Sequence, residues 1–179
     1  MHADKKILIK LYLLFIPVAF ASYLFHEFGH WIVGELLGND MVYSLNLVYP
    51  KSGTYINPNH NLYSSTGGPG FTILLAFFFF IIIEKYNSIF AYPVVIFRFV
   101  MRFFSLVFGG FAKQDEARIS IMLGLGTHTI GIIVLLILFI IVWLASMKLK
   151  IDLKQNGYFI TACILSQVLV IGTYQILNL

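Results

Sequence analysis

The amino-acid sequence predicts an all-α polytopic membrane protein, with about five to six transmembrane helices and a short β-hairpin-like segment after the first. Of its 179 residues, 59% are hydrophobic and only 11% are charged, and the mean hydropathy is +0.87. An ordinary soluble domain is far less apolar than this. Several apolar runs also approach the roughly 20 residues that a helix needs to cross a bilayer. We therefore expect an integral, multi-pass membrane protein.

Charge and cysteine content exclude other classes of protein. The net charge of +4 is spread over short segments between the apolar runs. It therefore bears on orientation in the lipid bilayer, and we expect no nucleic-acid partner. The single cysteine, Cys163, lies within an apolar run, which excludes an internal disulfide and a multi-cysteine metal site.

The first apolar segment runs from about residue 7 to residue 37. As a helix it would be roughly 46 Å long. Since the apolar core of a bilayer is about 30 Å thick, this helix must tilt, bend or project at one end. Residues 38–66 then interrupt the pattern with Gly, Asn, Pro and Ser, and the stretch "MVYSLNLVY" within them alternates as a strand does. The sequence predicts a short hairpin here.

Four further helices are predicted after this polar segment. The second helix follows "GGPG" and covers about residues 71–83, beginning a few residues earlier to complete a crossing, and the third covers about residues 89–111. The fourth and fifth cover about residues 127–147 and 158–177. Together with the first segment, they predict a single helical bundle.

The stretch "FHEFGHW", residues 25–31, places two histidines and a glutamate inside an apolar helix. Ionisable groups at such depth are costly and are therefore usually functional. Positions i and i+4 share a face of a helix, so His26 and His30 can present two imidazole nitrogens to one zinc ion. Glu27 can then accept a proton from a water molecule on that ion. The sequence thus predicts a Zn²⁺ site with Glu27 as the catalytic base.

A catalytic zinc needs a third protein ligand and keeps a fourth position open. The remaining candidates are Asp115, Glu116, His60, His128 and Glu35. We choose Asp115 as the third metal ligand, because it follows the third apolar run and can approach the histidine pair from there, and Glu116 is the main alternative. Arg98 and Arg102, one turn apart in the third helix, are expected to pair with carboxylates or to reach the interface.

The order of "HEFGH" in the first helix, "GGPG" at the second and a carboxylate after the third resembles the site-2 protease family of intramembrane zinc metalloproteases. The resemblance covers roughly residues 23–125. It implies that His26, His30 and Asp115 are zinc ligands, that Glu27 is the base, and that the pair Gly68-Pro69 is structural. The family commonly shows Asp-Gly after a stretch with Asn and Pro, where this chain has "AKQDEA".

These observations lead to one functional expectation and one alternative. Residues 1–179 would form a single transmembrane metalloprotease domain, with a catalytic core at about 7–125 and additional helices at about 127–147 and 158–177. This is a minimal form without a PDZ or other appended domain. It would hydrolyse peptide bonds in or near transmembrane segments of membrane proteins, with residues 38–66 holding the unwound substrate as an added strand. Its partners would be that substrate and the lipid bilayer. The alternative is a non-catalytic membrane protein whose structural or transfer zinc site binds transmembrane helices.

Overall fold

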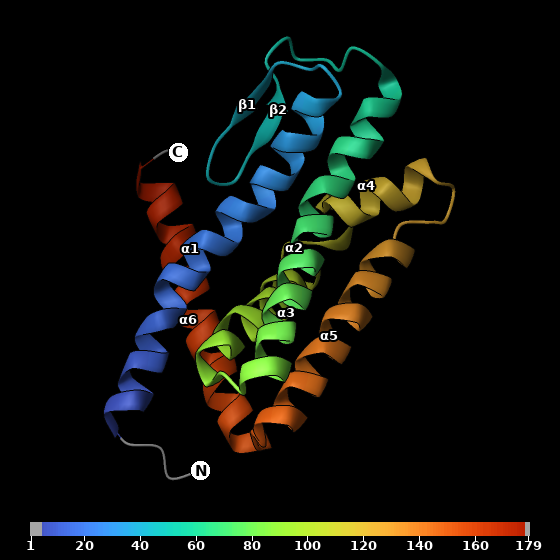
Figure 1. The fold of residues 1–179 in the computed structure, drawn as a ribbon. Helices are drawn as coiled ribbons and strands as arrows, with labels where there is room; N and C mark the ends of the chain where they lie inside the picture. Colours follow the sequence, from blue (N-terminus) through green and yellow to red (C-terminus); the bar gives the residue numbers. More distant parts are fainter. Residues whose placement is uncertain (1–4, 178–179) are drawn as a thin grey trace.

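Six α-helices and one two-stranded hairpin make up the part of the chain that the computed structural model describes, residues 5–177 (Figure 1). The predicted domain also included residues 1–4 and 178–179, which lie outside the described residues. In chain order the helices and strands are α1 (Lys5–Leu36), β1 (Met41–Tyr43), β2 (Val48–Pro50), α2 (Pro58–Tyr86), α3 (Tyr92–Phe108), α4 (Asp115–Met122), α5 (Thr129–Leu149) and α6 (Leu153–Leu177). Short 3₁₀ turns precede α3, at Ile89–Ala91, and α4, at Phe111–Lys113.

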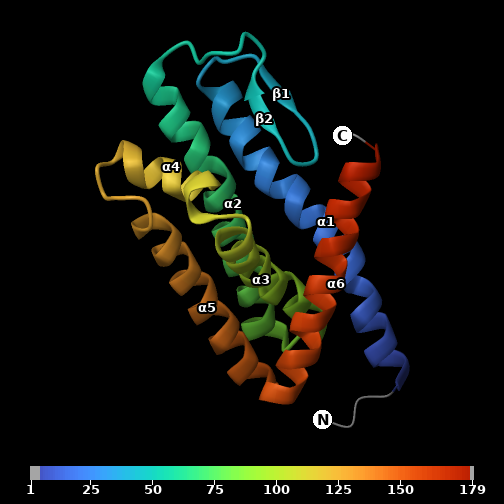
Figure 2. The same ribbon diagram turned by 180° about the vertical axis from the view of Figure 1, so that it is seen from behind.

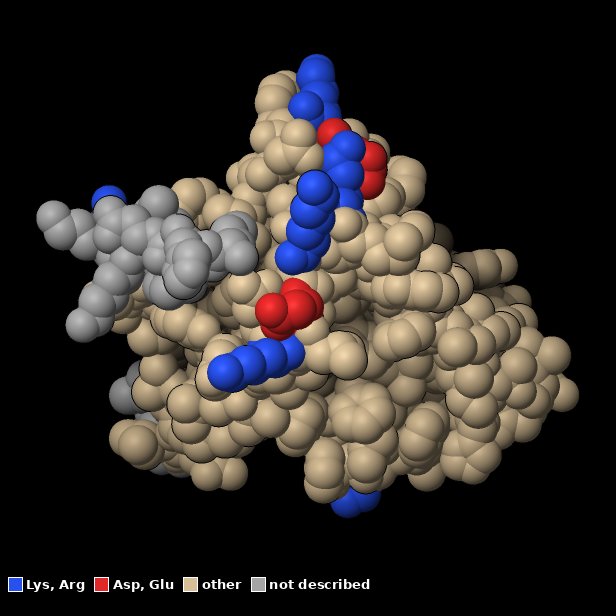
Figure 3. All heavy atoms as spheres, turned by 90° about the horizontal axis from the view of Figure 1, so that it is seen from below, with Lys and Arg blue, Asp and Glu red and all other residues tan. Residues whose placement is uncertain are grey.

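Five of these helices, all except the eight-residue α4, are long and apolar enough to cross a membrane. This confirms the predicted class of helical membrane protein with a hairpin after the first helix. Viewed from below, most of the charged side chains in sight form a band across one end of the molecule, and most of the other described surface is uncharged (Figure 3). Such a distribution fits a protein whose sides face lipid and whose ends face water.

Helix α3 lies at the centre of the bundle. It packs against α1, α2, α5 and α6, and most of its residues are buried (Figures 1 and 2). Figure 2 shows α6 on the opposite side of α3 from α2. Both arginines of α3 are therefore placed inside protein and away from lipid.

The hairpin was correctly predicted, and its register fixes which backbone groups are free. Val42 pairs with Tyr49 and Tyr43 pairs with Val48 in antiparallel order. The ladder continues on both sides, because the Ser44 N–H donates to the carbonyl of Leu47 and the Lys51 N–H donates to the carbonyl of Asp40. Hydrogen-bonded and non-hydrogen-bonded pairs alternate in such a ladder. The N–H and C=O of Val48 therefore point away from β1.

One predicted helix boundary was wrong, and one short helix was not predicted. The second helix does not begin at "GGPG", because α2 begins at Pro58 and contains residues 67–70 well inside it. Asn57 caps α2 by accepting a hydrogen bond from the Asn59 N–H, and Pro58 occupies the first turn, where its missing N–H costs nothing. No sequence pattern predicted α4, whose eight residues follow a short 3₁₀ turn at Phe111–Lys113.

Candidate metal centre

The site begins where α1 and α2 lie side by side. His26 and His30 lie one turn apart on α1 and face the glycine pair of α2. A Cβ atom placed on Gly68 would lie 2.6 Å from Cε1 of His30 and 2.7 Å from Cε1 of His26, so no side chain fits there. This close contact gives a physical reason for the predicted structural role of Gly68, since only a glycine lets both imidazoles lie against α2.

One ring nitrogen of His30 is held by the backbone of α2. Nδ1 of His30 lies 2.8 Å from the carbonyl oxygen of Ser64. The Gly68 N–H also points at this nitrogen, from 3.3 Å, but the closer carbonyl can only accept a hydrogen bond. Nδ1 of His30 therefore carries the proton, and Nε2 is left with a lone pair.

His26 is held in the same way by a side chain. Its Nδ1 lies 3.0 Å from Oγ1 of Thr72. The Thr72 hydroxyl donates its only proton to the carbonyl of Gly68, at 3.0 Å, so its oxygen accepts from Nδ1. In both histidines Nε2 is thus the free nitrogen, and an acceptor on the opposite ring nitrogen is what metal-binding histidines usually have.

Asp115, the first residue of α4, meets these two nitrogens. Its Oδ2 lies 3.3 Å from Nε2 of His26 and 3.2 Å from Nε2 of His30. One carboxylate oxygen of Asp115 thus lies between the two ring nitrogens that the backbone carbonyl of Ser64 and the hydroxyl of Thr72 leave free. A metal ion binds aspartate in its carboxylate form and histidine in its neutral form.

The arrangement fits a tetrahedral metal ion. The potential ligand atoms of the three side chains all lie within 4.8 Å of one another. Two ligands about 2.0 Å from zinc at the tetrahedral angle are separated by about 3.3 Å, close to the separations from Asp115 to His26 and to His30. A lone pair on each Nε2 and a carboxylate repel one another unless a cation lies between them. The donor set of two imidazoles and one carboxylate is one that zinc commonly takes.

A buried ion pair anchors α4 beside the histidines. Nε of Arg102 donates to Oε1 of Glu116 at 2.9 Å, and Nη2 of Arg102 donates to Oε2 of the same carboxylate. Both side chains are almost fully buried. Glu116, the main alternative as third ligand, is thus bound to α3, and this bond fixes the neighbouring residue Asp115 at the histidine pair.

The second carboxylate oxygen of Asp115 also has a partner. Nη1 of Arg118 lies 3.5 Å from Oδ1 of Asp115 and donates to Oγ of Ser65 at 3.1 Å. The two oxygens of Asp115 therefore have separate roles, with Oδ1 held by Arg118 and Oδ2 directed at the imidazoles. Arg118 connects the third candidate ligand to α2 through Ser65.

The other predicted candidates lie elsewhere. Oε1 of Glu35 accepts from the Met41 N–H, Nδ1 of His60 lies 3.2 Å from the Asn39 side chain, and the ring of His128 lies edge-on against Phe111. None of the three belongs to the histidine cluster of the described residues.

Glu27 borders a cavity that opens onto this cluster. The cavity has a volume of about 300 Å³ and is lined by His26, His30 and Asp115, by Arg102, and by residues 46–48 of the hairpin. Glu27 is only 9% exposed. The cavity brings a carboxylate, three potential metal ligands and the outward edge of β2 together around one space.

The sequence did not indicate which residues orient the three candidate ligands. In the structure these residues are Ser64, Ser65, Thr72, Glu116 and Arg118. Most of these contacts join positions 34 to 53 residues apart in the chain, and no local pattern marks such pairs. Only the expectation that Arg102 pairs with a carboxylate pointed to one of them, and that expectation is confirmed.

No protein-family model, curated protein or solved structure matches this chain.

Proposed function

We propose that this protein is an intramembrane zinc metalloprotease of the site-2 protease type, which hydrolyses peptide bonds in or near transmembrane segments of membrane proteins. The observation that supports this most directly is the approach of Nε2 of His26, Nε2 of His30 and Oδ2 of Asp115 to one point beside Glu27. Burying two histidines and a glutamate in a membrane-spanning helix costs free energy, and a bound metal ion offsets that cost.

The roles of the side chains follow from their positions. His26, His30 and Asp115 would hold zinc, which polarises a carbonyl group and lowers the pKa of bound water to about 7. Glu27 would accept a proton as the water oxygen attacks the peptide carbonyl carbon. It would then deliver this proton to the amide nitrogen as the C–N bond breaks, so that an acid and an amine are released. Ser64 and Thr72 would keep both imidazoles in the tautomer with a free Nε2.

The hairpin supplies a way to present a substrate backbone. A transmembrane helix hides its carbonyls in its own hydrogen bonds, so it must unwind before hydrolysis. Val48 borders the cavity and points its N–H and C=O away from β1. An extended substrate segment can pair with these groups as an added strand. The cavity beside β2 would then receive the scissile bond.

The alternative of a non-catalytic structural or transfer zinc site is less well supported. Structural zinc sites are usually closed by four protein ligands. The cluster has three such side chains in the described part of the chain, and they border a cavity of about 300 Å³. An open side of this kind suits a catalytic zinc ion.

The decisive experiment compares the purified wild-type protein with Glu27→Gln, in detergent, against a panel of transmembrane peptides, while bound zinc is quantified in both. We expect the wild type to cleave and Glu27→Gln to retain zinc but lose cleavage by at least about 100-fold, as expected for a general base. Glu84→Gln is the matched control, because Glu84 is exposed and pairs with Lys148 far from the cavity. Zinc bound in both proteins without cleavage of any peptide would favour the structural or transfer site. Absence of zinc from both would refute the proposal.

A further inference from the structure

Arg98 is a second buried arginine of α3, one turn before Arg102, and it has no carboxylate partner among the described residues. Its side chain is only 2% exposed. Nε and Nη1 of Arg98 are buried and make no hydrogen bond in the described structure. Arg102, by contrast, is paired with Glu116. The expectation that each arginine pairs with a carboxylate or reaches the interface is therefore met by Arg102 and not by Arg98.

Arg98 borders an apolar groove between α1, α2 and α3. This groove has a volume of about 260 Å³, and its walls include Pro17, Ala21 and Phe25 of α1 and Phe79 of α2. Ser22, one turn before His26, is the other polar residue in its lining, and Oγ of Ser22 is also buried without a partner. Two groups that can donate hydrogen bonds thus border one apolar groove.

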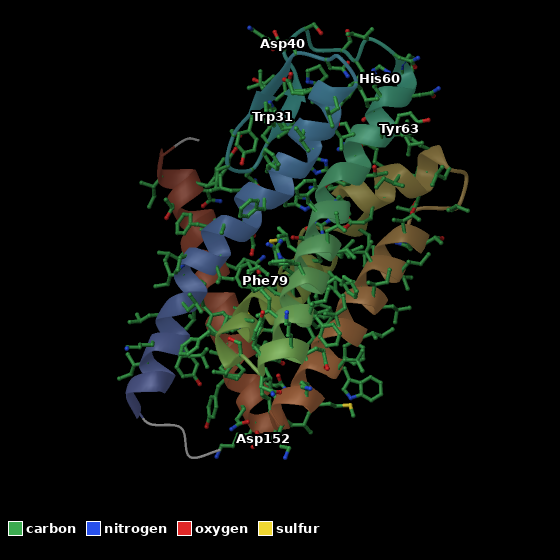
Figure 4. All side chains as sticks on the ribbon, in the orientation of Figure 1. Trp31, Asp40, His60, Tyr63, Phe79 and Asp152 are labelled. Carbon is green, nitrogen blue, oxygen red and sulfur yellow. The ribbon has the colours of Figure 1, made fainter. Side chains whose placement is uncertain are left out.

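The depth of the groove limits what can reach it. Arg98 lies at the middle of the 20-residue span Ile89–Phe108. At 1.5 Å per residue, the arginine is roughly 15 Å from either end of this span. Figure 4 shows Phe79 about midway between the ends of the bundle that carry Asp40 and Asp152. Lipid headgroups and soluble anions remain at the ends of the span, so neither suits a cation at this depth.

We propose that this groove docks the transmembrane helix of another protein, and that this helix carries an Asp or Glu near the middle of its own span. An unpaired arginine at the bilayer centre is costly, and a carboxylate that takes two of its hydrogen bonds offsets the cost. The long Arg98 side chain can turn its guanidinium toward a carboxylate in the groove, where Ser22 adds a hydroxyl donor. Small residues such as Ala21 let a second helix approach α1 closely.

Photo-crosslinking of two synthetic transmembrane peptides tests this proposal. The peptides are Leu-rich helices, identical except for Glu or Gln at mid-span, with a photoreactive residue one turn away. They are mixed with the full-length protein in nanodiscs of phosphatidylcholine, and crosslinks are mapped by mass spectrometry. Because the readout is crosslinking, its result does not depend on zinc or on cleavage, and its failure would leave the proposed protease activity untouched.

We expect the wild-type protein to crosslink the Glu peptide about fivefold more than the Gln peptide, which corresponds to a difference of about 1 kcal/mol in binding free energy. The crosslinks should lie on the groove face of α1 and α2. The ratio should fall to about one in Arg98→Met, since the preference depends on the guanidinium. It should persist in Lys148→Met, which removes a cation at the end of the bundle. Equal crosslinking of both peptides by the wild type would overturn the proposal. This comparison uses the wild-type protein alone, so it does not depend on whether a variant folds. Arg98-dependent labelling by a photoreactive fatty acid, without a preference for the Glu peptide, would overturn it in favour of a lipid carboxylate.

Discussion

Gly29 of α1 and Gly67 of α2 face each other where the two helices meet, and a Cβ atom on either residue would overlap the carbonyl oxygen of the other. The two backbones are therefore in direct contact at this level. His30 follows Gly29 in the chain and reaches the carbonyl of Ser64 for this reason. The geometry of the candidate metal centre thus depends on glycines as much as on its ligands.

Gly68→Ala should disturb the centre directly, because its methyl group would lie against the Cε1 atoms of His26 and His30. We expect a loss of about 1–3 kcal/mol in the free energy of unfolding, as for other overpacked sites, and weaker zinc binding. Gly70→Ala is the matched control, because a Cβ there meets nothing within 4 Å. Denaturant unfolding in detergent and zinc competition measure both quantities. Equal behaviour of the two variants would show that the contact at Gly68 is unimportant.

Thr72→Val should weaken zinc binding by about 10-fold or more, as for other partners of metal-binding histidines. Valine keeps the shape of threonine but cannot accept the hydrogen bond from Nδ1 of His26. Thr72→Ser keeps the hydroxyl and should bind zinc nearly as the wild type does. Competition with a fluorescent zinc chelator measures the affinities. If valine and serine variants bind zinc equally, Thr72 does not orient His26.

Zinc should stabilise the wild-type protein and should not stabilise Asp115→Ala. A ligand at 100 times its dissociation constant stabilises the folded state by about 2.7 kcal/mol. Asp115→Ala removes one of the three ligands, so its melting temperature should change little when zinc is added. Asp40→Ala serves as the control, because Asp40 is exposed at the hairpin end and pairs with Lys51. Stabilisation of Asp115→Ala equal to that of the wild type would exclude Asp115 as a ligand.

Glu116→Gln should destabilise the protein by about 3–5 kcal/mol, because it leaves the buried Arg102 without a counter-charge. Arg102→Met combined with Glu116→Leu should recover most of this loss, since it removes both charges together. Unfolding by denaturant in detergent compares the single and double variants. A double variant as unstable as Glu116→Gln would indicate that the loss comes from packing rather than from an unpaired charge.

Val48→Pro should lower the rate of substrate cleavage about fivefold, the effect of one lost hydrogen bond of about 1 kcal/mol. Proline removes the outward N–H of Val48 but leaves the pairing of β1 with β2 intact. Val48→Ala retains the N–H and should cleave as the wild type does. Cleavage of one transmembrane peptide by the three proteins is the measurement. If proline and alanine give the same rate, the substrate is not held as a strand added to β2.

Much of the fold could be predicted because it depends on local patterns. Apolar runs of sufficient length predicted the five long helices, and alternation in residues 41–49 predicted the hairpin. The start of α2 was misplaced because "GGPG" usually breaks a helix. Here the cap at Asn57 and the packing of the glycines on α1 keep the helix continuous through it.

The candidate site was predictable only in part for a related reason. The spacing of His26 and His30 is a property of one helix, so the sequence indicates their common face. Asp115 could be chosen only as one of several carboxylates, because its neighbours come from distant parts of the chain. The structure brings Asp115 to the histidines and gives Glu116 a different partner. The role of the three residues as zinc ligands remains a prediction.

The distance along the chain between His30 and Asp115 also sets an order of events during synthesis. The two residues are separated by 85 positions. At about 5–20 residues per second, the ribosome adds Asp115 roughly 4 to 17 s after His30. Until then the nascent chain carries both histidines and Glu27 but neither Asp115 nor the Arg102–Glu116 pair that positions Asp115. Under the proposed function, the nascent chain would stay inactive while α1 and α2 are made, and it would acquire activity only after α3 and α4 had been added.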